Sequence, residues 1–237
     1  MFFRLSFLFV LFFTLNLPVC GQHAIGLELN LNRDAVKIDD PGNEIRSTPR
    51  MNAAVGAVYQ YTFKKGFNLG LGLSLKHFKE SIGLKAGNLT STGQMVAQLP
   101  LTVGQNIFLL KNKIFISPLL GGAFNAMLFY NQNSQGSGSI GTRTDSLVLS
   151  YRTVDARQYY FTLQAGFQMG FYLNRSLCLY LFSKYTFGLS PVSRQYITYR
   201  HNLEPPQAAV QTLNGSYLTF LGIGISYALN RRPDIEE

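Results

Sequence analysis

Large apolar and small polar residues alternate along most of the chain. In residues 67–75 every odd position is Phe or Leu, and the even positions are Asn, Gly, Gly and Ser. The same alternation marks five more segments: 24–31, 51–63, 159–171, 177–189 and 217–227. Two less regular apolar segments, 94–109 and 114–130, contain Pro100 and Pro118. A period of two is that of a β-strand, whose side chains point to opposite faces in turn, so the pattern predicts eight strands.

The two faces of these strands have an unusual composition. One carries Leu, Ile, Phe and Tyr, and the other carries mostly Gly, Ser, Thr, Asn and Gln. Only 14% of all residues are charged, against roughly a quarter in soluble domains, so the polar face is a poor water-facing surface. Large apolar residues outside and small polar residues inside are typical of a transmembrane barrel. We therefore expect an all-β fold, an eight-stranded antiparallel transmembrane β-barrel.

The connections between the expected strands alternate between short and long. Three are short, namely 64–66, 111–113 and 174–176, and four are long, namely 32–50, 81–93, 131–156 and 191–213. Outer membrane barrels have short periplasmic turns and long extracellular loops, which predicts the orientation. Within 131–156, the alternation at residues 147–151 suggests a hairpin above the membrane. Because proline removes a ladder hydrogen bond, we expect a β-bulge at Pro100, at Pro118 or at both.

The N-terminal residues are typical of a secretory signal peptide. Arg4 precedes an apolar run at 5–15, and Pro18 ends it shortly before a cleavage site after Gly21. We expect a signal peptide at 1–21, a barrel at 22–229 in the bacterial outer membrane and a periplasmic tail at 230–237. Lipidation at Cys20 is disfavoured by the preceding Pro18-Val19. Cleavage would leave Cys178 without a disulfide partner, as a small hydrophobic residue.

The formal charge of +9 raises the possibility of nucleic acid binding. Nucleic acid binders gather their cations on one face or in runs. Here the cations are scattered, and the doublets Lys64-Lys65 and Arg231-Arg232 fall near the predicted periplasmic rim. We therefore expect no nucleic acid partner.

Few charges face the predicted lumen, which in an eight-stranded barrel is just wide enough for side chains to fill. They are Glu28, Lys76 and Lys184. Because a charge in a narrow lumen needs a partner, we hypothesise a Glu28–Lys184 pair that Lys76 joins. The alternative is separate hydration of the three charges. Glycines on the inward face would leave room for water.

Catalytic chemistry has little support in the sequence. Of the three histidines, His23, His77 and His201, only His77 has a serine and an acid close in sequence, at Ser81 and Glu80. A catalytic triad requires mutual hydrogen bonds that proximity in sequence does not establish. No metal-ligand spacing, cysteine cluster or phosphate-binding glycine loop is present in the sequence. We expect no enzyme activity, no metal and no cofactor.

The long connections are the better candidates for function, because binding sites tend to lie on loops held by a rigid scaffold. The connection 191–213 carries Arg194, Tyr196, Tyr199 and Arg200, followed by His201. Such a basic and aromatic set suits sugars or lipopolysaccharide phosphates, and the alternative is a solvated hairpin. The expected partners are outer membrane lipids, lipopolysaccharide, and envelope or secretion proteins.

Several short segments resemble the PorT-like outer membrane barrels of Bacteroidetes-type bacteria. They are Tyr-Gln-Tyr-Thr-Phe at 59–63, Leu-Pro-Leu at 99–101, 118–122, Tyr-Thr-Phe-Gly-Leu at 185–189 and the glycine-alternating last strand. The resemblance covers nearly the whole mature chain and extends in architecture to OmpA- and OmpX-like small barrels. It implies the fold and the location, and the founding member suggests an accessory role in secretion. One departure is that residues follow Tyr227, where many such barrels end on an aromatic residue.

Three functions follow as hypotheses. The leading one is a non-enzymatic barrel that binds a partner or stabilises the envelope, as a secretion accessory does. The second is a narrow solute channel, and the third is a lipid-modifying enzyme that depends on His77.

Overall fold

The computed structural model describes residues 21–47, 51–63, 65–84, 87–110, 113–128, 135–141, 146–154, 156–202 and 204–230. The expected signal peptide therefore lies outside the described residues, apart from Gly21. The strands are β1 (Gly21–Asp39), β2 (Ile45–Ser47), β3 (Met51–Phe63), β4 (Phe67–Leu84), β5 (Gly87–Gln105), β6 (Ile107–Leu109), β7 (Ile114–Met127), β8 (Gln135–Gly141), β9 (Ser146–Val154), β10 (Tyr159–Tyr172), β11 (Leu177–Gly188), β12 (Ser193–His201) and β13 (Gln207–Ala228).

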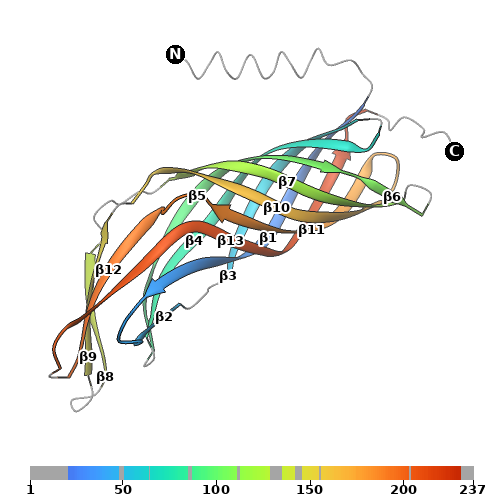
Figure 1. Cartoon of the computed structure of the whole chain (residues 1–237). Coiled ribbons are helices and arrows are strands. Elements are labelled where there is room, and N and C mark those ends of the chain that lie inside the picture. The colour runs from blue at the N-terminus through green and yellow to red at the C-terminus, as the bar shows by residue number, and fades with distance from the viewer. Residues whose placement is uncertain are drawn as a thin grey trace, which may run out of the picture.

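Eight of these strands close into a barrel. The order is β1-β3-β4-β5-β7-β10-β11-β13, and β13 pairs back with β1, every pairing being antiparallel (Figure 1). The eight-stranded antiparallel barrel predicted from the alternation is confirmed. No helix in the described part of the chain is long and apolar enough to cross a membrane.

The barrel has its apolar side chains on the outside. Leu27 and Leu29 of β1 are 62% and 64% exposed, whereas Asn125 of β7 is fully buried in the lumen. Large exposed hydrophobic side chains follow every barrel strand and form an outward belt. A belt of this kind is stable against lipid and would be costly against water, so the predicted inversion of polarity is confirmed.

Local hydrogen bonds stabilise the end of the barrel that carries the short turns. Asn174 Oδ1 accepts from the backbone N–H groups of Ser176 and Leu177, both at 2.8 Å, as in an Asx-turn. At the same end, Asn230 joins the first and last strands, because its side chain accepts from the His23 N–H and donates to the Gly21 carbonyl, both at 2.7 Å. These hydrogen bonds therefore hold the start of β1 against the end of β13.

The bulges predicted at the two prolines are wrong. Pro100 pairs with Ala123, and Pro118 pairs with Phe167, without a register shift on either side. Each proline simply leaves a gap in the ladder to its other neighbour, because a missing N–H requires a missing bond and not an extra residue. Shifts occur instead along β13, where Phe220 and Leu221 both point outward, and in the β4–β5 pairing between Ser81 and Ile82.

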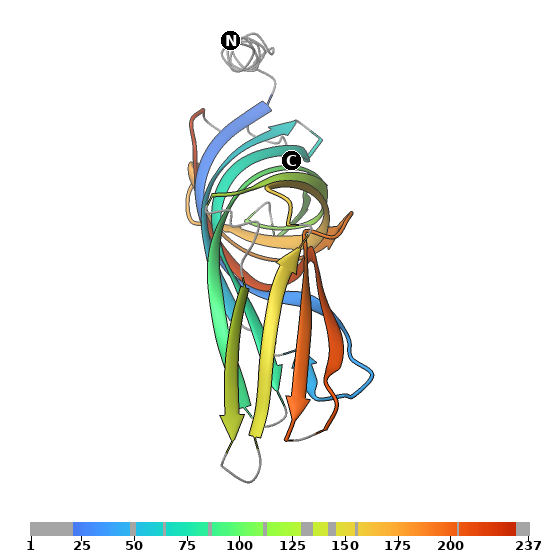
Figure 2. The ribbon, with the colours of Figure 1, turned by 90° about the vertical axis from the view of Figure 1, so that its left-hand side faces the viewer.

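The long connections are built largely of strands. β12 and residues 207–213 of β13 form a hairpin, β9 pairs with β12, and β8 pairs with β9. We call β8, β9, β12 and residues 207–213 the sheet extension, and it projects beyond the end of the barrel that carries the long connections (Figure 2). The hairpin predicted around residues 147–151 is confirmed, since β9 pairs with β8.

Candidate functional site

A buried ion pair lies in the lumen near the end that carries the long connections. Lys76 Nζ donates to Asp34 Oδ1, and the two side chains are 3% and 5% exposed. Asn52 also donates to Asp34, and Lys76 Nζ lies 3.5 Å from the centre of the Tyr217 ring. The four side chains come from β1, β3, β4 and β13, so they join strands across the lumen.

This arrangement corrects the expected lumen charge network. Glu28 and Lys184 line the same cavity but do not pair with each other in the described structure. Glu28 accepts a 3.1 Å hydrogen bond from the Tyr180 hydroxyl, and Lys184 Nζ lies 5.1 Å from the Phe182 ring centre. Asp34 was not among the predicted lumen charges because the first strand, predicted to end at Leu31, continues as β1 to Asp39.

Amides and hydroxyls extend the polar network across the lumen. Gln98 donates to Asn125 at 2.7 Å and accepts from Tyr217 at 3.2 Å, and Asn125 donates to Thr162 at 3.2 Å. Asn125 and Thr162 are almost completely buried. Buried amides that satisfy one another hold a single arrangement, because an unpaired one is costly.

Between this network and the end with the short turns, aromatic rings fill the space that inward glycines leave. Tyr180 pairs across strands with Gly224, and Phe182 pairs with Gly222. A Cβ on either glycine would lie 2.2 Å from the opposite ring, so each ring lies directly over a glycine backbone. Phe115 covers Gly170 in the same way. The glycines were expected to leave room for water, but these three make room for aromatic rings.

The lumen that remains consists of small cavities. One of about 40 Å³ is lined by Glu28, Gln164 and Lys184, and another of about 20 Å³ is lined by Gln22, Asn68 and Cys178. Since one water needs about 10–15 Å³, the first cavity has room for about three waters and the second for about one. The described lumen is therefore filled by side chains.

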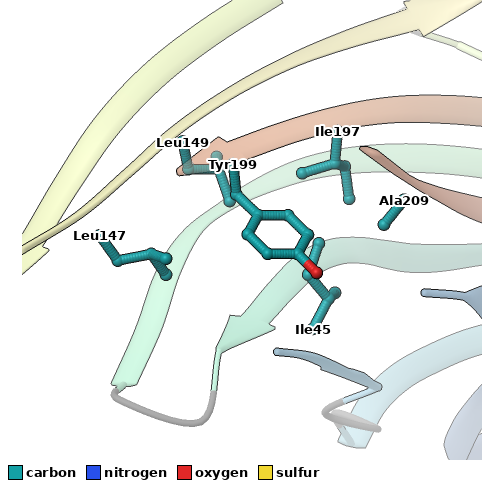
Figure 3. Packing of buried hydrophobic residues seen from close by; sticks show 6 residues of the cluster. All are labelled: Ile45, Leu147, Leu149, Ile197, Tyr199 and Ala209. Atoms are coloured by element: carbon teal, nitrogen blue, oxygen red, sulfur yellow. The ribbon is translucent and has the colours of Figure 1, made fainter. Parts of the chain in front are cut away.

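The sheet extension has a hydrophobic core of its own (Figure 3). Buried residues from β2, β9, β12 and β13 meet there, namely Ile45, Leu147, Leu149, Ile197, Tyr199 and Ala209. Ile38 and Tyr151 pack against them. Because the extension buries apolar side chains against β2 and the end of β1, it is a packed structure and not a free hairpin.

Asp40 fastens this core to the turn after β1. Its carboxylate accepts from the Ile45 N–H at 2.7 Å, the Gly42 N–H at 3.2 Å and the Tyr199 hydroxyl at 2.6 Å. Partial burial would raise the pKa of the Asp40 carboxyl, but these donors hold its pKa below the usual value. For the Tyr199 hydroxyl, burial and the adjacent Asp40 carboxylate both raise the pKa.

The residues proposed as a contact surface divide between two faces of β12. Tyr196 and Arg200 are exposed on the outer face, and Arg194 lies half-buried on that same face. Tyr199 is only 2% exposed and belongs to the core. Its inclusion in the surface was wrong, because β12 alternates and Tyr199 has the opposite parity to the other three.

A groove runs along the outer face where the extension meets the barrel. Its volume is about 540 Å³, and its lining includes Lys37, Asp39, Leu189, Ser190, Arg194 and Tyr196. The groove combines cations, a carboxylate, an aromatic ring and an exposed leucine, and it lies outside the lumen.

The histidines lie far apart along the fold. His23 Nδ1 lies 2.6 Å from the Tyr59 hydroxyl, His77 is half-buried on β4 opposite Met95, and His201 is exposed at the end of β12. The side chains of Glu80 and Ser81 lie outside the described set. Within the described residues, no group of three or more His, Cys, Asp or Glu side chains could hold a metal ion.

Solved structures with a similar fold are outer membrane proteins. The chain matches OprG from Pseudomonas aeruginosa with a TM-score of 0.52 and 13% identity, over 89% of this chain and 97% of OprG. It matches a major outer membrane protein from Thermus thermophilus with a TM-score of 0.47 and 10% identity, over 88% of this chain and 99% of that protein. The OprG match establishes the fold alone, that of an outer membrane β-barrel. No protein-family model matches the chain, and neither does any curated protein.

Proposed function

We propose that this chain is a non-enzymatic outer membrane barrel that binds a protein partner through its sheet extension. The observation that carries the proposal is the contrast between a filled lumen, with cavities of about 40 and 20 Å³, and a packed extension beyond the belt. Folding such an extension serves binding, because rigid surfaces lose little entropy when they bind. The outward apolar belt and the expected signal peptide support export and insertion in the outer membrane.

The edge strand β8 suits a partner that adds a strand. Among the described strands it pairs with β9 alone. Exposed edges are normally protected by charges or proline, yet residues 135–141 are Gln-Gly-Ser-Gly-Ser-Ile-Gly, with neither. Strand addition at an open edge is a common mode of recognition. The resemblance to PorT-like barrels supports an accessory of secretion as the biological setting.

Photo-cross-linking in intact cells tests the mode of binding. A photoreactive residue at Ser137 on β8 should give a discrete adduct with one protein. Thr198 is the matched control, because it is exposed in the same register row through Ser150 but lies two strands inward, about 10 Å away. Equal adducts at both positions would contradict strand addition at the edge.

Conductance separates this function from the narrow channel. The purified barrel in a planar bilayer should give no single-channel steps, because the polar network and the aromatic rings fill the lumen. Clear steps would overturn the proposal in favour of a channel. The enzyme hypothesis requires lipid changes in cells that express the protein, and their loss on His77→Ala would establish it.

A further inference from the structure

The groove on the outer face begins at the apolar belt. Phe187 near the end of β11 is 49% exposed, and Leu189 just beyond it is 60% exposed and lines the groove. The lower end of the groove is thus continuous with the surface that faces lipid. The other end of the groove lies on the sheet extension, where water-facing residues begin.

Basic residues line the end of the groove that lies on the sheet extension, and they occupy the same row of paired residues. Lys37 of β1 pairs with Thr212 of β13, which pairs with Arg194 of β12. The backbones of Lys37 and Arg194 are therefore two strands apart, about 10 Å, and both side chains line the groove. Two long basic side chains at this spacing can converge on one anionic group.

Two more arginines stand beside the groove. Arg157 lies 3.5 Å from the hydroxyl of Ser190, which lines the groove. Arg152 of β9 pairs directly with Tyr196 of β12, which lines the groove. Asp39 is the one carboxylate in the groove lining among the described residues. The described groove lining therefore holds two cations, Lys37 and Arg194, against one carboxylate, and the two neighbouring arginines add to this positive charge, which favours a phosphate group.

We propose that this groove binds a phosphorylated glycolipid of the outer leaflet. Lys37 and Arg194 hold a headgroup phosphate, Tyr196 contacts the sugar, and the acyl chains lie along the belt below Leu189. This site is on a different surface from the β8 edge, and it rests on the proposed outer membrane placement only. Its position where apolar and basic surfaces meet matches the polarity of such a lipid.

Binding to lipid A in detergent micelles, measured on the full purified barrel by native mass spectrometry, tests the site. Arg194→Gln should weaken binding about tenfold, because a charge-assisted hydrogen bond contributes that much. Adding Lys37→Gln should weaken it further. Arg200→Gln is the matched control, because Arg200, although grouped with Arg194 from the sequence, does not line the groove. The variant removes the same charge from the same face of β12, about 20 Å along the strand, and should leave binding unchanged.

Three outcomes would overturn the proposal. Equal losses for Arg194→Gln and Arg200→Gln would mean a general charge effect, and equal binding of dephosphorylated lipid A would remove the phosphate from recognition. Full competition by inorganic phosphate at the lipid's concentration would mean that the groove takes phosphate and not a lipid. Far-UV circular dichroism checks that each variant is folded. The assay needs no protein partner, and cell fractionation tests the membrane placement separately.

Discussion

Replacing Lys76 by methionine leaves the Asp34 carboxylate buried without its cation. Both side chains are at most 5% exposed, so water cannot easily take the place of the ammonium group. Removing one member of a buried ion pair typically costs about 3–5 kcal/mol. Asn52 still donates to Asp34, which places the expected loss for Lys76→Met near the lower end, at about 3 kcal/mol.

A double-mutant cycle separates the pair from its surroundings. Asp34→Asn should also destabilise the barrel, whereas Asp34→Asn combined with Lys76→Met removes both charges and should recover most of the loss. The free energy of unfolding is measured by urea titration in lipid vesicles. Far-UV circular dichroism is the suitable signal because the chain contains no tryptophan.

Lys184→Met is the matched control for this cycle. Lys184 is half-buried, and its amine lies 5.1 Å from the Phe182 ring centre, so its loss should cost less than about 1 kcal/mol. The pair does not stabilise this end of the lumen if Lys76→Met lowers the free energy of unfolding no more than Lys184→Met does. The same conclusion follows if the losses for Asp34→Asn and Lys76→Met are additive.

Three further predictions concern the lumen, the extension and the thiol. Gly224→Ala should cost about 1–3 kcal/mol because the new methyl meets the Tyr180 ring, and adding Tyr180→Ala should give a less than additive loss in the same urea titration. Since the pKa of Asp40 is held below its usual value near 3.8, its contribution to stability is complete above that value and is lost as the pH falls through the lowered pKa. The protection of the extension's amides, corrected for the intrinsic exchange rate at each pH, should fall on acidification, and Tyr199→Phe should move that fall to higher pH; a protection profile that Tyr199→Phe does not move would contradict this. Cys178 is 5% exposed, so a maleimide should label it only after unfolding, and rapid labelling of the folded barrel would refute its burial.

The strands could be predicted because two different environments, one on each face of the sheet, constrain their residues at once. Lipid outside and packed polar groups inside force a period of two over the segments that cross the membrane. β3 begins and ends where the alternation does, at Met51 and Phe63. Beyond the membrane this double constraint ends, which is why the continuation of β1 to Asp39 was not predicted.

The lumen contacts could not be predicted because they depend on register. The ring of Tyr180 covers Gly224 only because β11 and β13 pair with this offset, and the sequence does not state the offset. Asp34 becomes the partner of Lys76 through the same kind of long-range pairing. Tyr199 is different, since its parity relative to Tyr196 was already visible in the sequence and would have placed it on the opposite face.

β13 connects the two halves of the molecule. Its lower part closes the barrel against β1, and its residues 207–213 belong to the sheet extension. Between them, Gly215 has a φ of +73° and the register to β1 shifts, so the strand changes direction there. Tyr217 lies two residues further on and packs against Lys76. The buried ion pair thus stands at the base of the extension, where a filled lumen serves to hold a binding surface in a fixed position.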